Sequence, residues 1–255
     1  MTGVTFPRVL RSEWIKFWSL RSTVITLSLA VAGFVGVGLL ASALGFDADS
    51  DETGGPDVIG LSLAGSNIAM LVLGALGILV MTGEYGTGTI RSTLSAVPRR
   101  LPVLAAKVVV FGTVSYALMF AAALVSFVAG QAIIGDAGAA LSDDGVFRAL
   151  AGTTAFVTGA GLLGLLLGTV LRSTPGTLST YFGVMFVLAG VIQLVLSESW
   201  RDNLGKYLPS AAGDAMGSVV QAADELTPGR GALVFAGYLV LLGALAAWRL
   251  KRSDA

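Results

Sequence analysis

The side chains that could carry chemistry gather between residues 83 and 107, in the stretch GEYGTGTIRSTLSAVPRRLPVLAAK. This stretch separates two long apolar runs, and its charged residues are one acid and four bases: Glu84, Arg91, Arg99, Arg100 and Lys107. A single carboxylate among cations, with no nucleophile beside a base and no second carboxylate, does not indicate catalysis. The pattern instead predicts a cationic surface that a soluble partner can bind.

The rest of the sequence excludes several kinds of site. The chain has no cysteine and no histidine, which removes disulfides, thiolate chemistry, the usual zinc sites and histidine acid–base catalysis. Gly205-Lys206 lacks the preceding glycine and the following Ser or Thr of a Walker A loop. The acidic loop 45–60 does not have the ligand spacing of a calcium loop. We therefore expect no enzyme activity, no cofactor and no metal in this chain.

The stretch 83–107 is expected to place its charges on a short amphipathic helix. Apolar residues recur there at spacings of three and four, which puts them on one helix side: Ile90, Leu94, Val97, Leu101 and Leu104. Gly86 and Gly88 permit a sharp turn before it, and Pro98 and Pro102 restart the chain afterwards. A basic inner loop that simply rests on lipid remains an alternative interpretation.

Composition indicates an all-α integral membrane protein. The 255 residues are 55% hydrophobic and 13% charged, with a mean hydropathy of +0.82, whereas a soluble domain has about 25% charged residues. Six apolar runs are each close to the roughly 20 residues that a helix needs to cross a bilayer. They cover residues 23–44, 61–81, 108–134, 150–171, 177–196 and 232–248, and none contains a charged residue.

Charge asymmetry gives the orientation. With six spans, 12 of the 16 basic residues fall on the side of the N-terminus and four on the other side. The positive-inside rule then predicts that both termini lie in the cytoplasm and that the chain spans the cell membrane. Because the loss of one span would scramble this alternation, the asymmetry also supports the number six.

Residues 5–22 predict an N-terminal helix that lies in the membrane interface. Aromatic and aliphatic residues occupy one half of the wheel, and Arg8, Arg11 and Lys16 occupy the other. Trp14 and Trp18 are expected to anchor this helix among the headgroups. The outer loop 197–231 mixes apolar residues with glycine and proline, which suggests short helices that return toward the spans.

Glycines recur within the spans at close spacing, notably Gly74, Gly77, Gly161, Gly164 and Gly168. Small residues let membrane helices approach closely. Sequence leaves two interpretations open, namely packing inside the bundle and a seam between two copies.

The order Glu84-Tyr85, Gly88-Thr89-Ile90-Arg91, Pro98-Arg99-Arg100 and Lys107 resembles the first cytoplasmic loop of ABC exporter permeases of the second type. The resemblance implies a coupling helix in this loop, an elbow helix at the N-terminus and two short outer helices before the last span. It further implies a homodimer and a separately encoded ABC ATPase that binds ATP and Mg²⁺. Membrane lipid is the remaining expected partner, and nucleic acid is not expected.

The resemblance assigns roles to particular residues. Contact with the ATPase is expected from Glu84, Tyr85, Thr89, Ile90, Arg91, Leu94, Val97, Pro98, Arg99 and Arg100. The elbow helix is expected to contribute Arg8, Arg11, Glu13, Trp14 and Lys16. Our own hypothesis is that Glu84 links the second span to the loop 83–107 through a basic neighbour on the N-terminal helix, such as Lys16 or Arg11.

The pathway is expected at a seam between two copies, lined by the first, second and fifth spans. Asn67 and Gln193 are its candidate polar contacts. Apolar walls favour a lipophilic or amphipathic cargo such as a drug, a peptide antibiotic or a lipid, as in multidrug efflux. The alternative from another class is an ATPase-independent carrier or an immunity or sensor protein.

Overall fold

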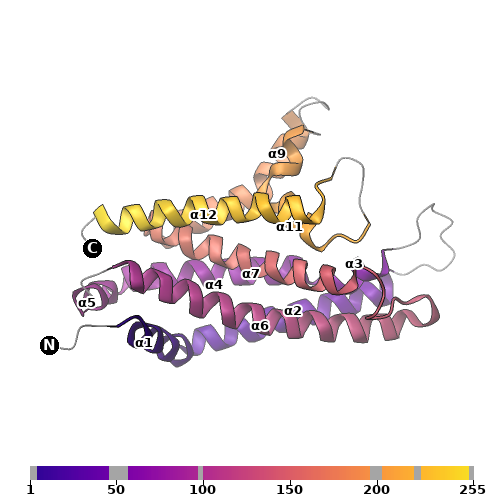
Figure 1. The fold of residues 1–255 in the computed structure, drawn as a ribbon, viewed down its shortest axis with the longest axis horizontal. Helices are drawn as coiled ribbons and strands as arrows, with labels where there is room; N and C mark the ends of the chain where they lie inside the picture. The colour runs from indigo at the N-terminus through magenta and orange to yellow at the C-terminus, as the bar shows by residue number, and fades with distance from the viewer. Residues whose placement is uncertain (1–4, 46–56, 97–99, 196–202, 221–224, 253–255) are drawn as a thin grey trace.

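The computed structural model describes residues 5–45, 57–96, 100–195, 203–220 and 225–252. Within these ranges every regular element is a helix, which confirms the all-α fold. Six helical stretches in them are long and apolar enough to cross a bilayer: Arg21–Leu44, Val58–Gly86, Leu101–Ala137, Val146–Leu171, Thr174–Ile192 and Pro228–Arg252. Each overlaps one predicted span. Figure 1 shows both chain ends at the same end of the elongated bundle, as an even number of spans requires.

Helix α7 (Val146–Leu171) is the centre of the bundle, and α4 (Ser66–Gly86) packs along it. Their backbones touch, because a β-carbon on Gly77 would overlap the carbonyl of Gly161 and one on Gly164 would overlap the carbonyl of Gly74. These glycines therefore serve packing inside the bundle. Helix α6 (Leu101–Ile134) also lies against α7, with the ring of Phe111 at Gly161.

The second span is broken near the end that lies away from the chain termini. Helix α3 (Val58–Leu63) stops before α4, and Gly65 lies between them against the carbonyl of Phe34 in α2 (Arg21–Leu44). Two side chains of α6 bind carbonyls of α3: Ser126 Oγ donates to Ser62 at 2.6 Å and Gln131 Nε2 donates to Val58 at 2.7 Å. Such bonds are what allow a broken helix inside a bilayer, where unpaired backbone groups are costly.

The fifth span bends away from the bundle. Helix α8 (Thr174–Phe182) is tied to α4 by Tyr181, whose hydroxyl donates to the carbonyl of Met70 at 3.1 Å. A π-helical turn, η2 (Gly183–Val187), then leads into α9 (Leu188–Val195), which projects from the bundle in Figure 1. Leu194 is 88% exposed. This span thus offers a large apolar surface to its surroundings.

The predicted short helices before the last span are present. The turn η3 (Gly205–Tyr207) is followed by α11 (Pro209–Gly217), which packs on α7 and on α12 (Pro228–Arg252). A further 3-10 turn, η1 (Gly135–Ala137), ends the third span. Helix α12 contributes Phe235, Ala246 and Leu250 to the core, and the Phe235 ring meets that of Phe156 edge to face at 5.3 Å.

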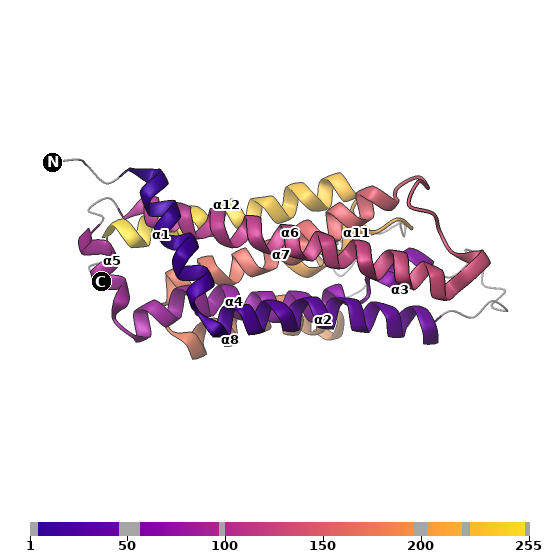
Figure 2. The ribbon, with the colours of Figure 1, turned by 90° about the horizontal axis from the view of Figure 1, so that it is seen from below.

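Two short elements lie at the end of the bundle that carries the termini, and Figure 2 shows one of them, α1 (Phe6–Ser19), crossing α6 and leading into the start of α2. The other, α5 (Thr89–Ala96), follows α4. Sequence predicted a single apolar side from Ile90 to Leu104, but Arg100 is a bend and α6 begins at Leu101, with Pro102 in its first turn.

Candidate coupling site

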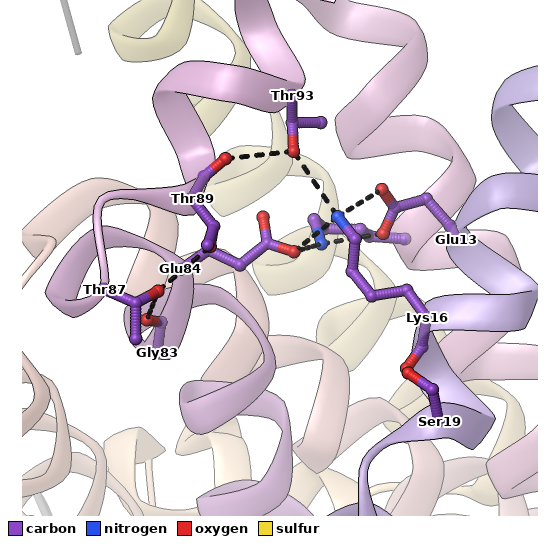
Figure 3. Close-up of polar contacts among 9 residues, drawn as sticks. Glu13, Lys16, Ser19, Gly83, Glu84, Thr87, Thr89 and Thr93 are labelled. Atoms are coloured by element: carbon purple, nitrogen blue, oxygen red, sulfur yellow. Dashed lines mark hydrogen bonds and ion pairs between the residues drawn. The ribbon is translucent and has the colours of Figure 1, made fainter.

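Four charged side chains from three helices form a closed ring at this end of the bundle. Glu13 and Lys16 come from α1, Glu84 from α4 and Lys107 from α6. Lys16 Nζ lies 3.0 Å from Glu13 Oε1 and 2.8 Å from Glu84 Oε1. Lys107 Nζ lies 2.8 Å from Glu13 Oε2 and 2.7 Å from Glu84 Oε1. We call these four residues the ion-pair ring, and Figure 3 shows how the acids of α1 and α4 converge on Lys16.

Three of the four residues of the ion-pair ring are buried. The side chains of Lys107, Glu13 and Glu84 are 2%, 5% and 10% exposed, whereas that of Lys16 is 34% exposed. Two acids and two bases make its formal charge zero, so alternating opposite charges replace the lost hydration. Removal of one buried member would leave a charge without compensation, which typically costs about 3–5 kcal/mol.

Helix α1 positions two members of the ring by its packing. Its buried side is the line Val9, Glu13 and Phe17, spaced by one helical turn. Phe17 meets Phe111 of α6 edge to face at 6.3 Å, which brings Glu13 toward Lys107. Leu20 is extended and lets α2 start in a new direction. The buried side of α1 thus includes an acid, Glu13, whereas the sequence pattern predicted only aromatic and aliphatic residues on that side.

Lys16 holds its proton more firmly than an ordinary lysine does. Burial alone would lower its pKa, but the hydrogen bond to Glu84 and the charge of Glu13 outweigh this and raise the pKa above its usual value. The residue is thus a permanent cation at neutral pH.

A tight turn connects α4 to α5. Gly88 has φ +72°, a conformation that favours glycine, and Thr87 donates to the carbonyl of Gly83 at 2.9 Å. Ile90 is buried against the bundle, whereas Thr89 is exposed. Thr93 Oγ1 lies 3.5 Å from Lys16 Nζ, at the outer limit of a hydrogen bond. The ring therefore lies directly against α5.

Two further contacts tie neighbouring helices to α4 and α6. The guanidinium of Arg172, in the left-handed position that ends α7, lies 5.1 Å from the centre of the Tyr85 ring. Arg100 Nη1 donates to the carbonyl of Leu250 in α12 at 3.2 Å. Tyr85 and Arg100, both predicted to contact a partner, thus also have contacts within the chain.

The remaining predicted residues are spread over several places. Arg8, Arg11 and Trp14 are exposed on α1. Asn67 is exposed beside the break before α4 and donates to the carbonyl of Ala64 at 3.4 Å. Outside the described residues or side chains lie Arg91, Leu94, Val97, Pro98, Arg99 and Gln193.

The contact between Glu84 and Lys16 is the one site interaction that sequence predicted and the structure confirms. Sequence reasoning missed Lys107, which it placed in a loop although α6 already begins at Leu101. The signal that could have found it is the apolar run VLAAKVVV, in which Lys107 interrupts an otherwise continuous helical core. No group of metal-binding side chains occurs among the residues that the structure describes.

A family described as ABC-2 family transporter protein matches residues 58–255, more than three-quarters of the chain. The chain belongs to the ABC-2 transporter family. Together with the six apolar helices, this makes it a multi-pass membrane permease. The match begins after α1 and α2, so half of the ion-pair ring of this ABC-2 permease lies outside the matched region. No curated protein matches the chain.

Members of the ABC-2 family are the membrane component of a transporter and generally work with an ABC ATPase. In this ABC-2 permease, the ion-pair ring lies where α1, α4, α5 and α6 meet, which makes it the candidate site for interaction between the membrane helices and a partner.

Proposed function

We propose that this chain is the membrane subunit of an ATP-driven exporter, acting as a homodimer and driven by a separate ATPase that binds ATP and Mg²⁺. The ATPase would bind the end of the bundle that carries both termini, which would face the cytoplasm. The observation that carries the proposal is the ion-pair ring, since it joins α1, α4 and α6 immediately beside α5.

The ring can transmit a displacement because it resists separation. Its two best-buried contacts, from Lys107 to Glu13 and to Glu84, cross from α6 to α1 and to α4. To pull α4 or α6 away would leave a buried charge without its partner, whereas α1 carries one acid and one base that also pair with each other. Movement of α5 would therefore carry α4, and with it α7, whose backbone α4 touches.

Helix α5 is suited to be the docking element. It is short and follows a glycine turn, and Ile90 fixes it on the bundle while Thr89 and Ser92 are exposed. The cations Arg91 and Arg99 are proposed to meet acidic side chains of the ATPase. The exposed basic side of α1, with Arg8 and Arg11, is proposed to extend the same surface.

The fifth span supports the proposed dimer and pathway. Val187, Leu194 and Val195 are at least 60% exposed, so a second copy or lipid must cover them in a membrane. A pathway along such a seam would have apolar walls and would favour a lipophilic or amphipathic cargo. Asn67 is a candidate polar contact in it.

Co-purification tests the partner. The permease is co-expressed with a Walker A ATPase encoded in the neighbouring reading frame, and the ATPase retained per permease is measured. Arg99→Glu is expected to lower that amount, since it reverses a proposed contact charge. Lys206→Glu in η3, near the opposite end of the bundle, is the matched control and is expected to retain wild-type binding. Equal retention by both variants would contradict the docking assignment.

Reconstitution tests the energy source. The purified chain in liposomes is expected to move a lipophilic dye only when the ATPase and ATP are present on the docking side. Flux that follows an ion gradient without nucleotide would show a secondary carrier instead. Protection of cells without any flux would show an immunity or sensor protein.

A further inference from the structure

A cavity of about 530 Å³ lies beside the ion-pair ring, between the corner where α1 meets α2 and the last turns of α4. We call it the corner cavity. Its volume falls within the range of about 300–1,000 Å³ that is usual for sites of small molecules. Leu20 and Leu79 line it and are 50% and 47% exposed, so the cavity opens to the side of the bundle.

The corner cavity is polar at one end and apolar at the other. The ion-pair ring, Thr87 and Thr89 line the end nearer the termini. Leu79 and Val80 precede Glu84 in α4, and Val110 follows Lys107 in α6, so these three line the end deeper in the bundle. This gradient runs along the spans, in the same direction as the gradient from headgroup to acyl chain in a bilayer.

Groups suited to a phosphate line the cavity or lie next to it in the sequence. Helix α2 begins at Arg21, and both Arg21 and Ser22 are exposed, with Ser22 among the lining residues. A guanidinium, a hydroxyl and the first amides of a long helix together favour an anion. On α1, Trp14 and Trp18 are exposed and pack edge to face at 6.0 Å, as is typical of rings in the headgroup layer.

We propose that the corner cavity binds a phospholipid of the surrounding bilayer, with one acyl chain between Phe17, Leu79 and Val110 and its phosphate at Arg21 and Ser22. The lateral opening faces the bilayer, and the ring presents no net charge that would select a charged cargo. The lipid would exclude water from the open side of Lys16 and so strengthen the ring, which makes it a structural cofactor of the elbow.

The lipid is measured by native mass spectrometry of the detergent-purified full chain, titrated with phosphatidylglycerol. Wild type is expected to retain one phospholipid. Gly83→Leu is expected to weaken binding on the order of ten-fold, equivalent to about 1.4 kcal/mol. Gly83 lines the cavity and a β-carbon there meets nothing within 4 Å, so a side chain can be added at this position and is expected to occupy the cavity.

The matched control is Gly237→Leu in α12, which also meets nothing within 4 Å and lies away from the cavity. It is expected to bind as wild type does. If Gly83→Leu does not fold, Leu79→Trp fills the same cavity from its wall. Arg21→Gln is expected to weaken phosphatidylglycerol binding more than binding of an uncharged diacylglycerol.

A wild type that binds no phospholipid, or equal binding by the cavity-filling variant and Gly237→Leu, overturns the proposal. A lipophilic cargo that displaces phosphatidylglycerol from wild type would likewise overturn it, because the cavity would then be a cargo site. None of these results bears on ATPase co-purification, so this proposal and the proposed function can fail separately.

Discussion

Lys107 is the member of the ion-pair ring whose loss should matter most. Its side chain is 2% exposed and bonds to Glu13 at 2.8 Å and to Glu84 at 2.7 Å. Lys107→Met keeps the approximate length and apolar stem but removes the cation, so two buried carboxylates face each other across Lys16 alone. Each charge-assisted hydrogen bond contributes about 1.5–3 kcal/mol, and breaking a buried pair typically costs about 3–5 kcal/mol. We expect a destabilisation within the latter range.

Lys16→Met provides the comparison within the same ring. Lys16 also contacts both acids, but its side chain is 34% exposed, and solvent screening reduces such contacts to roughly 1 kcal/mol. The assay is thermal unfolding of the purified chain in one detergent, followed by tryptophan fluorescence. At roughly 2–4 °C per kcal/mol for a chain of this size, Lys107→Met should lower Tm by about 6–20 °C and Lys16→Met by about 2–4 °C.

Lys251→Met, at an exposed position in the last turn of α12, controls for the loss of one positive charge and should leave Tm unchanged. The double variant Glu84→Gln/Lys107→Met should be less destabilised than the sum of its single variants, because the first change removes the charge that the second would leave unpaired. Equal small shifts for the two lysines, or strict additivity in the cycle, would refute the view that burial makes Lys107 the centre of the ring.

Two further predictions concern helix contact and pH. Gly77→Ala should destabilise the chain by about 1–3 kcal/mol, because its β-carbon would overlap the carbonyl of Gly161. Gly36→Ala, whose β-carbon would meet nothing within 4 Å, should be neutral or stabilising. Both are measured by the same thermal unfolding assay, and equal effects would show that α4 and α7 are not in backbone contact. Since the pKa of Lys16 is raised on folding, its stabilising contribution is complete below the ordinary lysine pKa of about 10.4 and is lost only above it. The Tm difference between wild type and Lys16→Met should therefore stay constant from about pH 7 to about pH 9, because this whole range lies well below that pKa. A difference that shrinks within this range would contradict the raised pKa of Lys16.

The sequence was most informative about features that repeat along the chain. Apolar runs near the length of a bilayer crossing revealed the six spans, and glycine with proline around α5 marked a turn that Gly88 confirms with its φ of +72°. Glu84 was expected to meet Lys16 or Arg11 of the N-terminal helix, and the structure shows the contact with Lys16.

What sequence could not reveal depends on contacts between distant residues. Glu13 looked like one polar residue of a surface helix, since its partner Lys107 lies 94 positions away. The break between α3 and α4 has no proline to announce it and is maintained by Ser126 and Gln131 of another helix. The π-helical turn Gly183–Val187 before α9 likewise contains no proline to announce it.

The ion-pair ring also sets an order of events during synthesis of the chain. Glu13 and Lys16 leave the ribosome long before Lys107, which is contributed by the third membrane-crossing helix. The elbow can therefore complete its docking only after that helix has been inserted. Until then Glu13 and Lys16 remain hydrated, and the later insertion of Lys107 completes the ion pairs that hold α1 in place.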